Sequence, residues 1–150
     1  MANGQRTDPF VSFRFKVEVD NVIQAGFSEC SGLQVETEVE EVREGGVNEF
    51  IHRIPKGSKH VNLTLKHGIT DSDALWSWHK DVVSGQKKVE RKMVSVLLLD
   101  AQGQEKWRWS FQGAYPVKWV GPELKADGSA VAIETLELAH HGFDAKVTKG

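Results

Sequence analysis

Glutamate stands at every second position over one part of the chain, at Glu36, Glu38 and Glu40. Two carboxylates at a suitable distance can act as acid and base in glycoside hydrolysis. Residues at i and i+2 of a strand, however, lie side by side on one open face, where nothing buries one acid and raises its pKa. The series therefore favours a solvated wall over a catalytic pair.

The chain also carries six histidines, a single cysteine and several serines beside glycines. No two histidines have helical ligand spacing, and the neighbours His140 and His141 would point to opposite faces of a strand. Ser28, Ser31 and Ser58 lack the G-x-S-x-G pattern of a nucleophile elbow. The spacing predicts no metal site, cofactor or catalytic residue, while a triad of residues distant in sequence stays open as an alternative.

Two further motifs have a phosphate-binding or docking interpretation. Gly45-Gly46 lacks the following Gly-Lys and the helix start of a phosphate loop. The basic run with Lys87, Lys88 and Arg91 is typical of a solvated turn. The alternative is a patch that meets an acidic surface on a neighbouring subunit.

Composition narrows the class of protein. The chain has 150 residues, enough for one domain over 1–150, with 1–8 and 146–150 expected to be flexible. Nineteen basic against 21 acidic residues argue against a dedicated nucleic-acid binder. No apolar run approaches the roughly 20 residues of a membrane span. The first residues lack the apolar stretch of a secretory signal, so we expect synthesis and assembly in the cytoplasm.

The elements around the glutamates form the most distinctive stretch, residues 31–55. Val35 and Val39 alternate with the glutamates, as in a half-buried strand, and Gly45-Gly46 would supply a tip at which φ can be positive. Residues 47–54 return, and Pro55 would end the hairpin before a turn at 56–58. A phase slip at 40–42 suggests a β-bulge in the outbound strand. We expect the apolar face to pack within the subunit and the strand edges to need partners.

The rest of the chain alternates in the same way. The sum is about eight strands and one helix, which predicts a mainly antiparallel β-barrel or sandwich with the helix beside it. The other predicted elements are strands at 10–20, 22–27, 61–65, 93–99 (covered on both faces), 105–111 and 131–140, a further segment beginning at Pro116, a loop at 28–32, a turn at 100–103, a helix of about fourteen residues between a Thr70 N-cap and a Gly85 C-cap, and an unstructured tail from Lys146.

Several strings stand in a fixed order over residues 8–143. They are Asp8-Pro9, FRFKVEVD, AGFSECSGL, REGG with Asn48, IPKG, NLTLKHG, the helix with Leu75 and Trp78, VLLLDAQGQEKWRW, AYPVKWVGPEL and AIETLELAHHG. This ordered set resembles the tail tube proteins of contractile phage tails and contractile injection systems. Lys56, where the family usually has a turn glycine, and His141, where an acid is common, depart from the pattern.

The resemblance implies a structural subunit without enzymatic activity. Such subunits form hexameric rings that stack into a hollow tube, with strands joining a continuous inner barrel. A contracting sheath drives this tube through a target membrane. The implied partners are the chain itself, the sheath, the baseplate, spike and cap proteins, and cargo or DNA in the lumen. The final location would be the injection particle or phage tail, including release outside the cell.

We therefore assign hypothetical roles to particular residues. The expected ring or stack contacts are Val35, Val39, Gly45, Gly46, Asn48, Lys87, Lys88 and Arg91, and the candidates for the lumen are Glu36, Glu38 and Glu40. Two alternatives stay open: a tube-initiator or adaptor ring at the baseplate, and a monomeric β-barrel binding module.

Overall fold

The computed structural model describes residues 8–12, 14–24, 26–43, 51–85 and 90–148. These residues form ten β-strands and one α-helix. In chain order they are β1 (Phe15–Val19), β2 (Val22–Gln24), β3 (Phe27–Ser31), β4 (Val35–Arg43), β5 (Ile51–His60), β6 (Leu63–Gly68), α1 (Ala74–Ser84), β7 (Lys92–Leu99), β8 (Glu105–Val120), β9 (Ile133–Ala139) and β10 (Phe143–Val147). The predicted class, a mainly antiparallel β structure with one packed helix, is confirmed.

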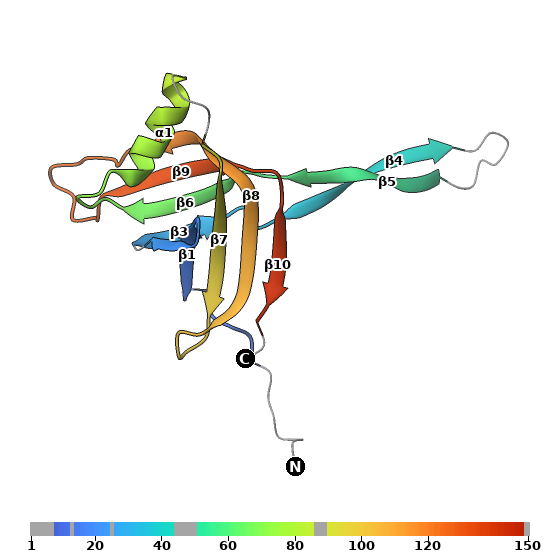
Figure 1. The fold of residues 1–150 in the computed structure, drawn as a ribbon, viewed down its shortest axis with the longest axis horizontal. Coiled ribbons are helices and arrows are strands. Elements are labelled where there is room, and N and C mark those ends of the chain that lie inside the picture. Colours follow the sequence, from blue (N-terminus) through green and yellow to red (C-terminus); the bar gives the residue numbers. More distant parts are fainter. Residues whose placement is uncertain (1–7, 13, 25, 44–50, 86–89, 149–150) are drawn as a thin grey trace, which may run out of the picture.

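Eight strands form one sheet in the order β2-β1-β7-β8-β9-β6-β3, with β10 paired to β8, while β4 and β5 form a separate two-stranded sheet. The long strand β8 pairs first with β7 and β10, and then, over residues 115–120, with β9. Figure 1 shows that β1, β7, β10 and the first part of β8 make one layer, which β3, β6 and β9 cross. We call these two layers and the helix the body.

The core lies where the two layers cross. Side chains at alternate positions of β1, β7 and β8 pack against side chains at alternate positions of β6 and β9. The core is therefore built on the predicted two-residue period of the strands. The side chains with at most 1% exposure include Val17, Leu63, Leu65, Val94, Phe111, Leu136 and Leu138. Strand β7 is covered on both faces from Val94 to Leu97, as its apolar run predicts.

Pro116 does not begin a new segment, because β8 runs through it as one strand of 16 residues. The register with β9 shifts between Pro116 and Lys118, which leaves Val117 as an extra residue. Proline has no N–H for a ladder hydrogen bond, and a bulge is a place where that bond is not needed. The bend at this point lets one strand serve both layers.

Four other features differ from the predictions. The first strand begins at Phe15, and the predicted loop at 28–32 instead contains most of β3, which pairs with β6. Strand 131–140 is not the last, since β10 follows it and pairs with β8. Lys146 and Val147 lie in β10, so the prediction of an unstructured tail from Lys146 is wrong for these two residues.

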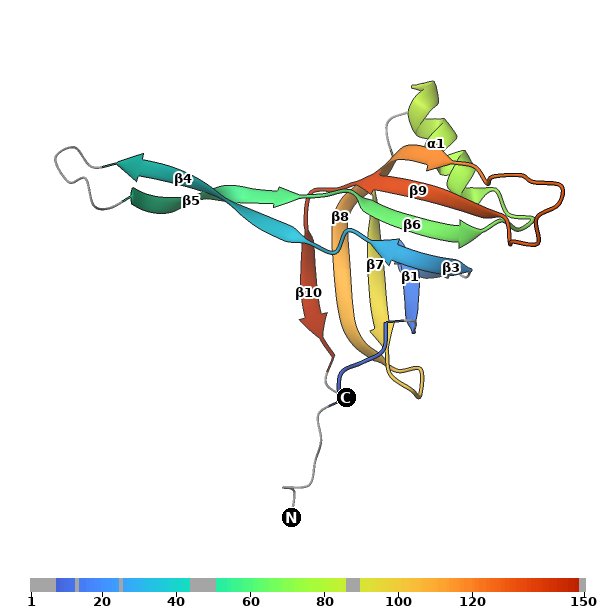
Figure 2. The ribbon, with the colours of Figure 1, turned by 180° about the vertical axis from the view of Figure 1, so that it is seen from behind.

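Helix α1 begins later than the sequence indicates. Thr70 is not the N-cap: its Oγ1 accepts a hydrogen bond from the N–H of Ser72 at 3.2 Å, and Asp73 takes the N-cap position without a side-chain cap bond. Gly85 ends the helix in the left-handed conformation at φ 64°, as predicted. The helix packs on the end of β8, where the rings of Trp76 and Trp119 are 4.8 Å apart (Figure 2). No helix within the described part of the chain has the length and apolar character to cross a membrane.

Candidate assembly surfaces

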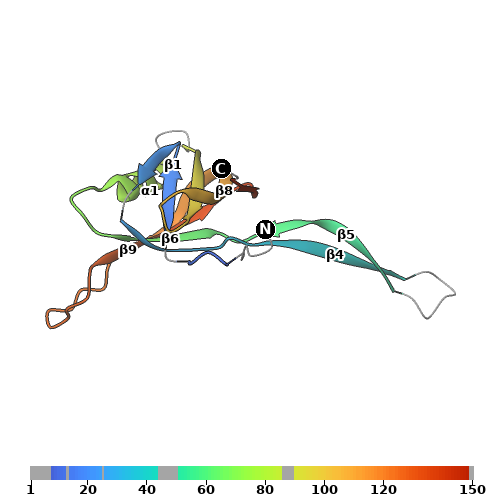
Figure 3. The same ribbon diagram turned by 90° about the horizontal axis from the view of Figure 1, so that it is seen from below.

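The β4–β5 hairpin extends away from the body as a narrow ribbon, which Figure 3 shows from below. Its return strand does not stop at Pro55 but continues to His60, so residues 56–58 belong to a strand and not to a turn. Glu38 pairs with Gly57 and Val39 with Pro55, which leaves Lys56 as the bulged residue. The bulge was predicted on the other strand, at 40–42. The bulge lies on β5 instead, next to Pro55, because proline has no N–H to donate to the strand ladder.

Neither face of this hairpin is covered by the body. All described residues of β4 and β5 whose side chains are placed are exposed, except His60 at the root. Val35 and Val39 are 56% and 51% exposed. The expectation that this apolar face packs within the subunit is therefore wrong, because no part of the described body lies against it.

The register separates the hairpin into two different faces. Val35, Thr37 and Val39 share one face with their partners His60, Ser58 and Pro55. Glu41 and Arg53 lie on the same face and form an ion pair at 3.9 Å. Glu36, Glu38 and Glu40 share the opposite face with Lys59, Gly57 and Ile54. The glutamates thus form the solvated wall that their spacing indicates. Whether this wall faces a lumen stays a prediction.

Of the other predicted assembly residues, the structure describes only Arg91. Gly45, Gly46, Asn48, Lys87 and Lys88 lie outside the described residues. Arg91 is bound within its own subunit: its guanidinium lies 4.6 Å from the centre of the Tyr115 ring, and Nη1 is 3.0 Å from Nε2 of His141. A docking role for Arg91 would have to break or share these contacts.

Sequence reasoning missed an apolar cleft beside the root of the hairpin. Its volume is about 670 Å³, and it is lined by residues of β1, β3, β7 and β8, among them Phe15, Phe27, Cys30, Leu98 and Trp109. Burial raises the pKa of the Cys30 thiol to about 12. The cleft was not visible in the sequence because its walls come from strands far apart in the chain.

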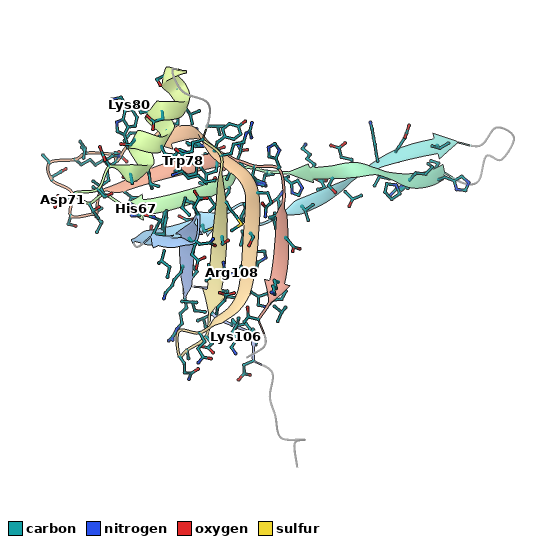
Figure 4. The ribbon with its side chains drawn as sticks, viewed as in Figure 1. His67, Asp71, Trp78, Lys80, Lys106 and Arg108 are labelled. Atoms are coloured by element: carbon teal, nitrogen blue, oxygen red, sulfur yellow. The ribbon has the colours of Figure 1, made fainter. Side chains whose placement is uncertain are left out.

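A charged cluster lies in the layer that contains β1, β7 and β8. Arg108, near the start of β8 and labelled in Figure 4, lies 2.9 Å from Oε2 of Glu18 and 2.7 Å from Oε1 of Glu105. The hydrogen bond from Arg108 holds the pKa of Glu105 below its usual value. Within the described residues, no group of three or more His, Cys, Asp or Glu side chains is placed to hold a metal ion.

Solved structures share this architecture. A chain of the six-fold symmetrised anti-feeding prophage baseplate is 27% identical over 96% of this chain and 99% of that chain, with a TM-score of 0.82. A chain of the sheath–tube complex of an extracellular contractile injection system is 24% identical over 93% of both chains, also with a TM-score of 0.82. Hcp1 from Flavobacterium johnsoniae is 15% identical over 91% of this chain and 97% of its own length, with a TM-score of 0.56. The last two likenesses show the fold alone.

No curated protein sequence matches the chain at a significant level. The family model of the T4-like virus tail tube protein gp19, in contrast, matches residues 11–144, which include β1 to β9, the helix and the start of β10. The chain therefore belongs to the T4-like virus tail tube protein gp19 family.

Proposed function

We propose that this chain is a structural subunit of the inner tube of a contractile injection system or contractile phage tail. The observation that carries the proposal is the hairpin, whose apolar face is left uncovered by its own subunit. Exposed valine and isoleucine side chains on a long ribbon favour association, because burying them removes apolar surface from water. Because the chain belongs to a tail tube protein family, the proposed form of this association is a tube.

The strand edges support assembly into a closed ring. The eight-stranded sheet has β2 and β3 at its ends, and β10 has a partner on one side only, in the part of the chain that the structure describes. Unpaired edges are a hazard in a monomer, and a cyclic ring of identical subunits removes them. Hexameric rings that stack into a hollow tube would place the glutamate face of the hairpin on the bore or against the next ring.

The proposed partners and location follow from this role. The tube would contact further copies of the chain, the sheath around it, and the baseplate, spike and cap proteins at its ends, with cargo or DNA passing through the lumen. Assembly would take place in the cytoplasm before the particle reaches its target. The relatives are structural tube proteins, and we propose no catalytic step for this chain.

The test places charge on the uncovered apolar face. Replacing both Val35 and Val39 with Asp should abolish rings and tubes while leaving the subunit folded, because a buried unpaired charge is very costly whereas an exposed one is not. Size-exclusion chromatography, negative-stain microscopy and circular dichroism report assembly and folding separately. Val83→Asp, on the exposed side of α1, is the matched control. Tubes of normal diameter from the double variant would refute the proposed role of this face.

A second candidate within the same machine is an initiator or adaptor ring. The baseplate structure, at 27% identity over nearly the full length, is the observation that favours it. A main tube protein should form tubes of unlimited length by itself, since each ring offers the next one the same surface. An adaptor should stop at single rings or short stacks, which negative-stain microscopy distinguishes directly.

The apolar cleft beside Cys30 is the observation that would favour a monomeric binding module instead. That alternative requires a protein that stays monomeric at high concentration and retains a small apolar molecule in the cleft. Native mass spectrometry of the purified chain detects both properties.

A further inference from the structure

Histidines from two distant parts of the chain lie where the hairpin joins the body. His60 is the last residue of β5, and His140 and His141 connect β9 to β10. The rings of His60 and His140 are 5.6 Å apart, and both contact Phe143. Val61, the residue directly after the hairpin, bonds to this cluster through its carbonyl oxygen.

Both ring nitrogens of His140 are engaged by backbone groups of opposite type. Nε2 lies 2.9 Å from the carbonyl oxygen of Val61, which can only accept, so this nitrogen carries the proton. Nδ1 accepts a hydrogen bond from the N–H of Gly142 at 3.0 Å, so this nitrogen is unprotonated. The two contacts together define the neutral ring with its proton on Nε2.

A second proton on His140 would go to Nδ1 and face the N–H of Gly142. Two donors would then meet at 3.0 Å, so that the ring must turn or the backbone must move. Turning the ring also removes the bond to Val61, which holds the chain at the foot of the hairpin. Gly142 stands at φ +115°, a backbone conformation that favours glycine, and a Cβ added there would lie 3.1 Å from Nε2 of His60.

His141, the next residue, lies against Arg91. Nη1 of Arg91 can only donate, so Nε2 of His141, at 3.0 Å, must accept. The N–H of His141 donates to the carbonyl oxygen of Gln112 at 2.9 Å, which ties the same connection to β8. A protonated His141 would face a cation.

The surrounding groups offer little negative charge to compensate. On β5 the facing group is His60, whose buried Nδ1 has no hydrogen-bond partner among the described residues. On β8 it is Tyr115 beneath Arg91. Glu137 of β9, opposite Lys118, accepts a hydrogen bond from Nδ2 of Asn62 at 3.0 Å. On β10, Phe143 faces the cluster, and Asp144 next to it points to the other side of the strand.

We propose that His60, His140 and His141 form a pH-sensitive joint, which fixes the foot of the hairpin to the body at neutral pH and releases it when His140 is protonated. The proposal concerns the subunit itself and does not require that tubes form. Its consequence for an assembly is that acidification would loosen the ribbon through which the subunit reaches its neighbours.

The direction of the pH dependence follows from burial. Burial lowers the pKa of His140, and the nearby His60 and His141 lower it further, against the opposing effect of the Val61 carbonyl. The unfolded chain therefore takes up the proton first as the pH falls below about 6.5. The contribution of the joint is complete above that pH and is lost between about 6.5 and the lower pKa of the folded state.

Nitrogen-15 NMR of the imidazole rings tests the geometry on the parent protein without any variant. We expect the Nε2–H form for His140 and the Nδ1–H form for His141 at pH 7.5. A proton on Nδ1 of His140 at that pH would overturn the proposal.

Amide hydrogen exchange tests the release. After correction for the intrinsic rate, exchange at residues 60–62 and 140–143 should rise at least ~10-fold between pH 7.5 and pH 5 in the parent chain. His140→Gln keeps one donor and one acceptor but cannot titrate, so exchange should change less than ~2-fold over the same range. His52→Gln, on the exposed hairpin, should behave like the parent. Equal protection at both pH values in the parent would overturn the proposal, as would an unchanged pH response in His140→Gln.

Discussion

The body and the hairpin are built from the same alternation of apolar and polar residues, yet only the body buries its apolar positions. Val17 on β1 is 0% exposed, because β7 pairs beside it and the second layer lies over it, whereas Val35 on β4 is 56% exposed. An alternating strand therefore indicates which side chains share a face, and the presence or absence of a second layer decides whether that face is covered.

This difference has a functional meaning. A two-stranded ribbon is at best marginally stable alone in water. The hairpin keeps its paired form beyond the body, with Val35 and Val39 on one face and Glu36, Glu38 and Glu40 on the other. In the proposed tube, neighbouring subunits would cover the ribbon and supply the stabilising contacts that its own body does not make.

The largest expected effect comes from shortening a buried side chain of the body, compared with shortening an exposed side chain of the hairpin. Leu136→Ala removes a side chain with 0% exposure between β6 and β8 and should lower the free energy of unfolding by about 3 kcal/mol. Val39→Ala should change it by less than about 0.5 kcal/mol, since none of the described residues of the body covers that side chain. Urea denaturation of the unassembled subunit measures both. A cost at Val39 equal to that at Leu136 would mean that the hairpin packs on its own body.

Two glycines, Gly32 before the hairpin and Gly57 within it, should differ in how well they tolerate a side chain. Gly32 has φ +101°, and a Cβ there would overlap the carbonyl oxygen of Asn62, so Gly32→Ala should cost about 2 kcal/mol. Gly57, inside the hairpin, has open space where a Cβ would be, and Gly57→Ala should be neutral or slightly stabilising. Thermal unfolding of the two variants side by side is the measurement. Equal losses would show that the hairpin backbone is as constrained as its root.

The smallest effect compares two ion pairs. Arg108 is 25% exposed and bonds Glu18 and Glu105, while Arg53 is 74% exposed and lies 3.9 Å from Glu41. Arg108→Met should cost about 1 kcal/mol at pH 7, and Arg53→Met close to none. Because Arg108 lowers the pKa of Glu105, its contribution is present above the unfolded pKa of about 4.3 and is lost as the pH falls through the folded pKa. Urea midpoints of parent and Arg108→Met should therefore converge towards pH 3, and a constant gap would contradict this account.

Local chemistry made much of the fold predictable. The strand alternation in β6, β7 and β9, the left-handed C-cap at Gly85 and the turn that ends at Gly103 depend on residues close in sequence. The two prolines misled the prediction: Pro55 was expected to end the hairpin and Pro116 to begin a new segment, but each lies beside a bulge within one strand. Strand β10 was missed because its short sequence has a partner only once β8 is in place.

The sequence by itself determined which residues alternate, where the chain turns, that the glutamates share one face, and the family to which the ordered motifs point. Only the tertiary structure decided that Val35 and Val39 are uncovered, that a cleft opens beside Cys30, and that His60 meets His140. The physical reason is the range of the interactions. Periodicity, caps and turns act over a few residues, whereas burial and the state of a histidine depend on groups that the sheet topology brings together from distant parts of the chain.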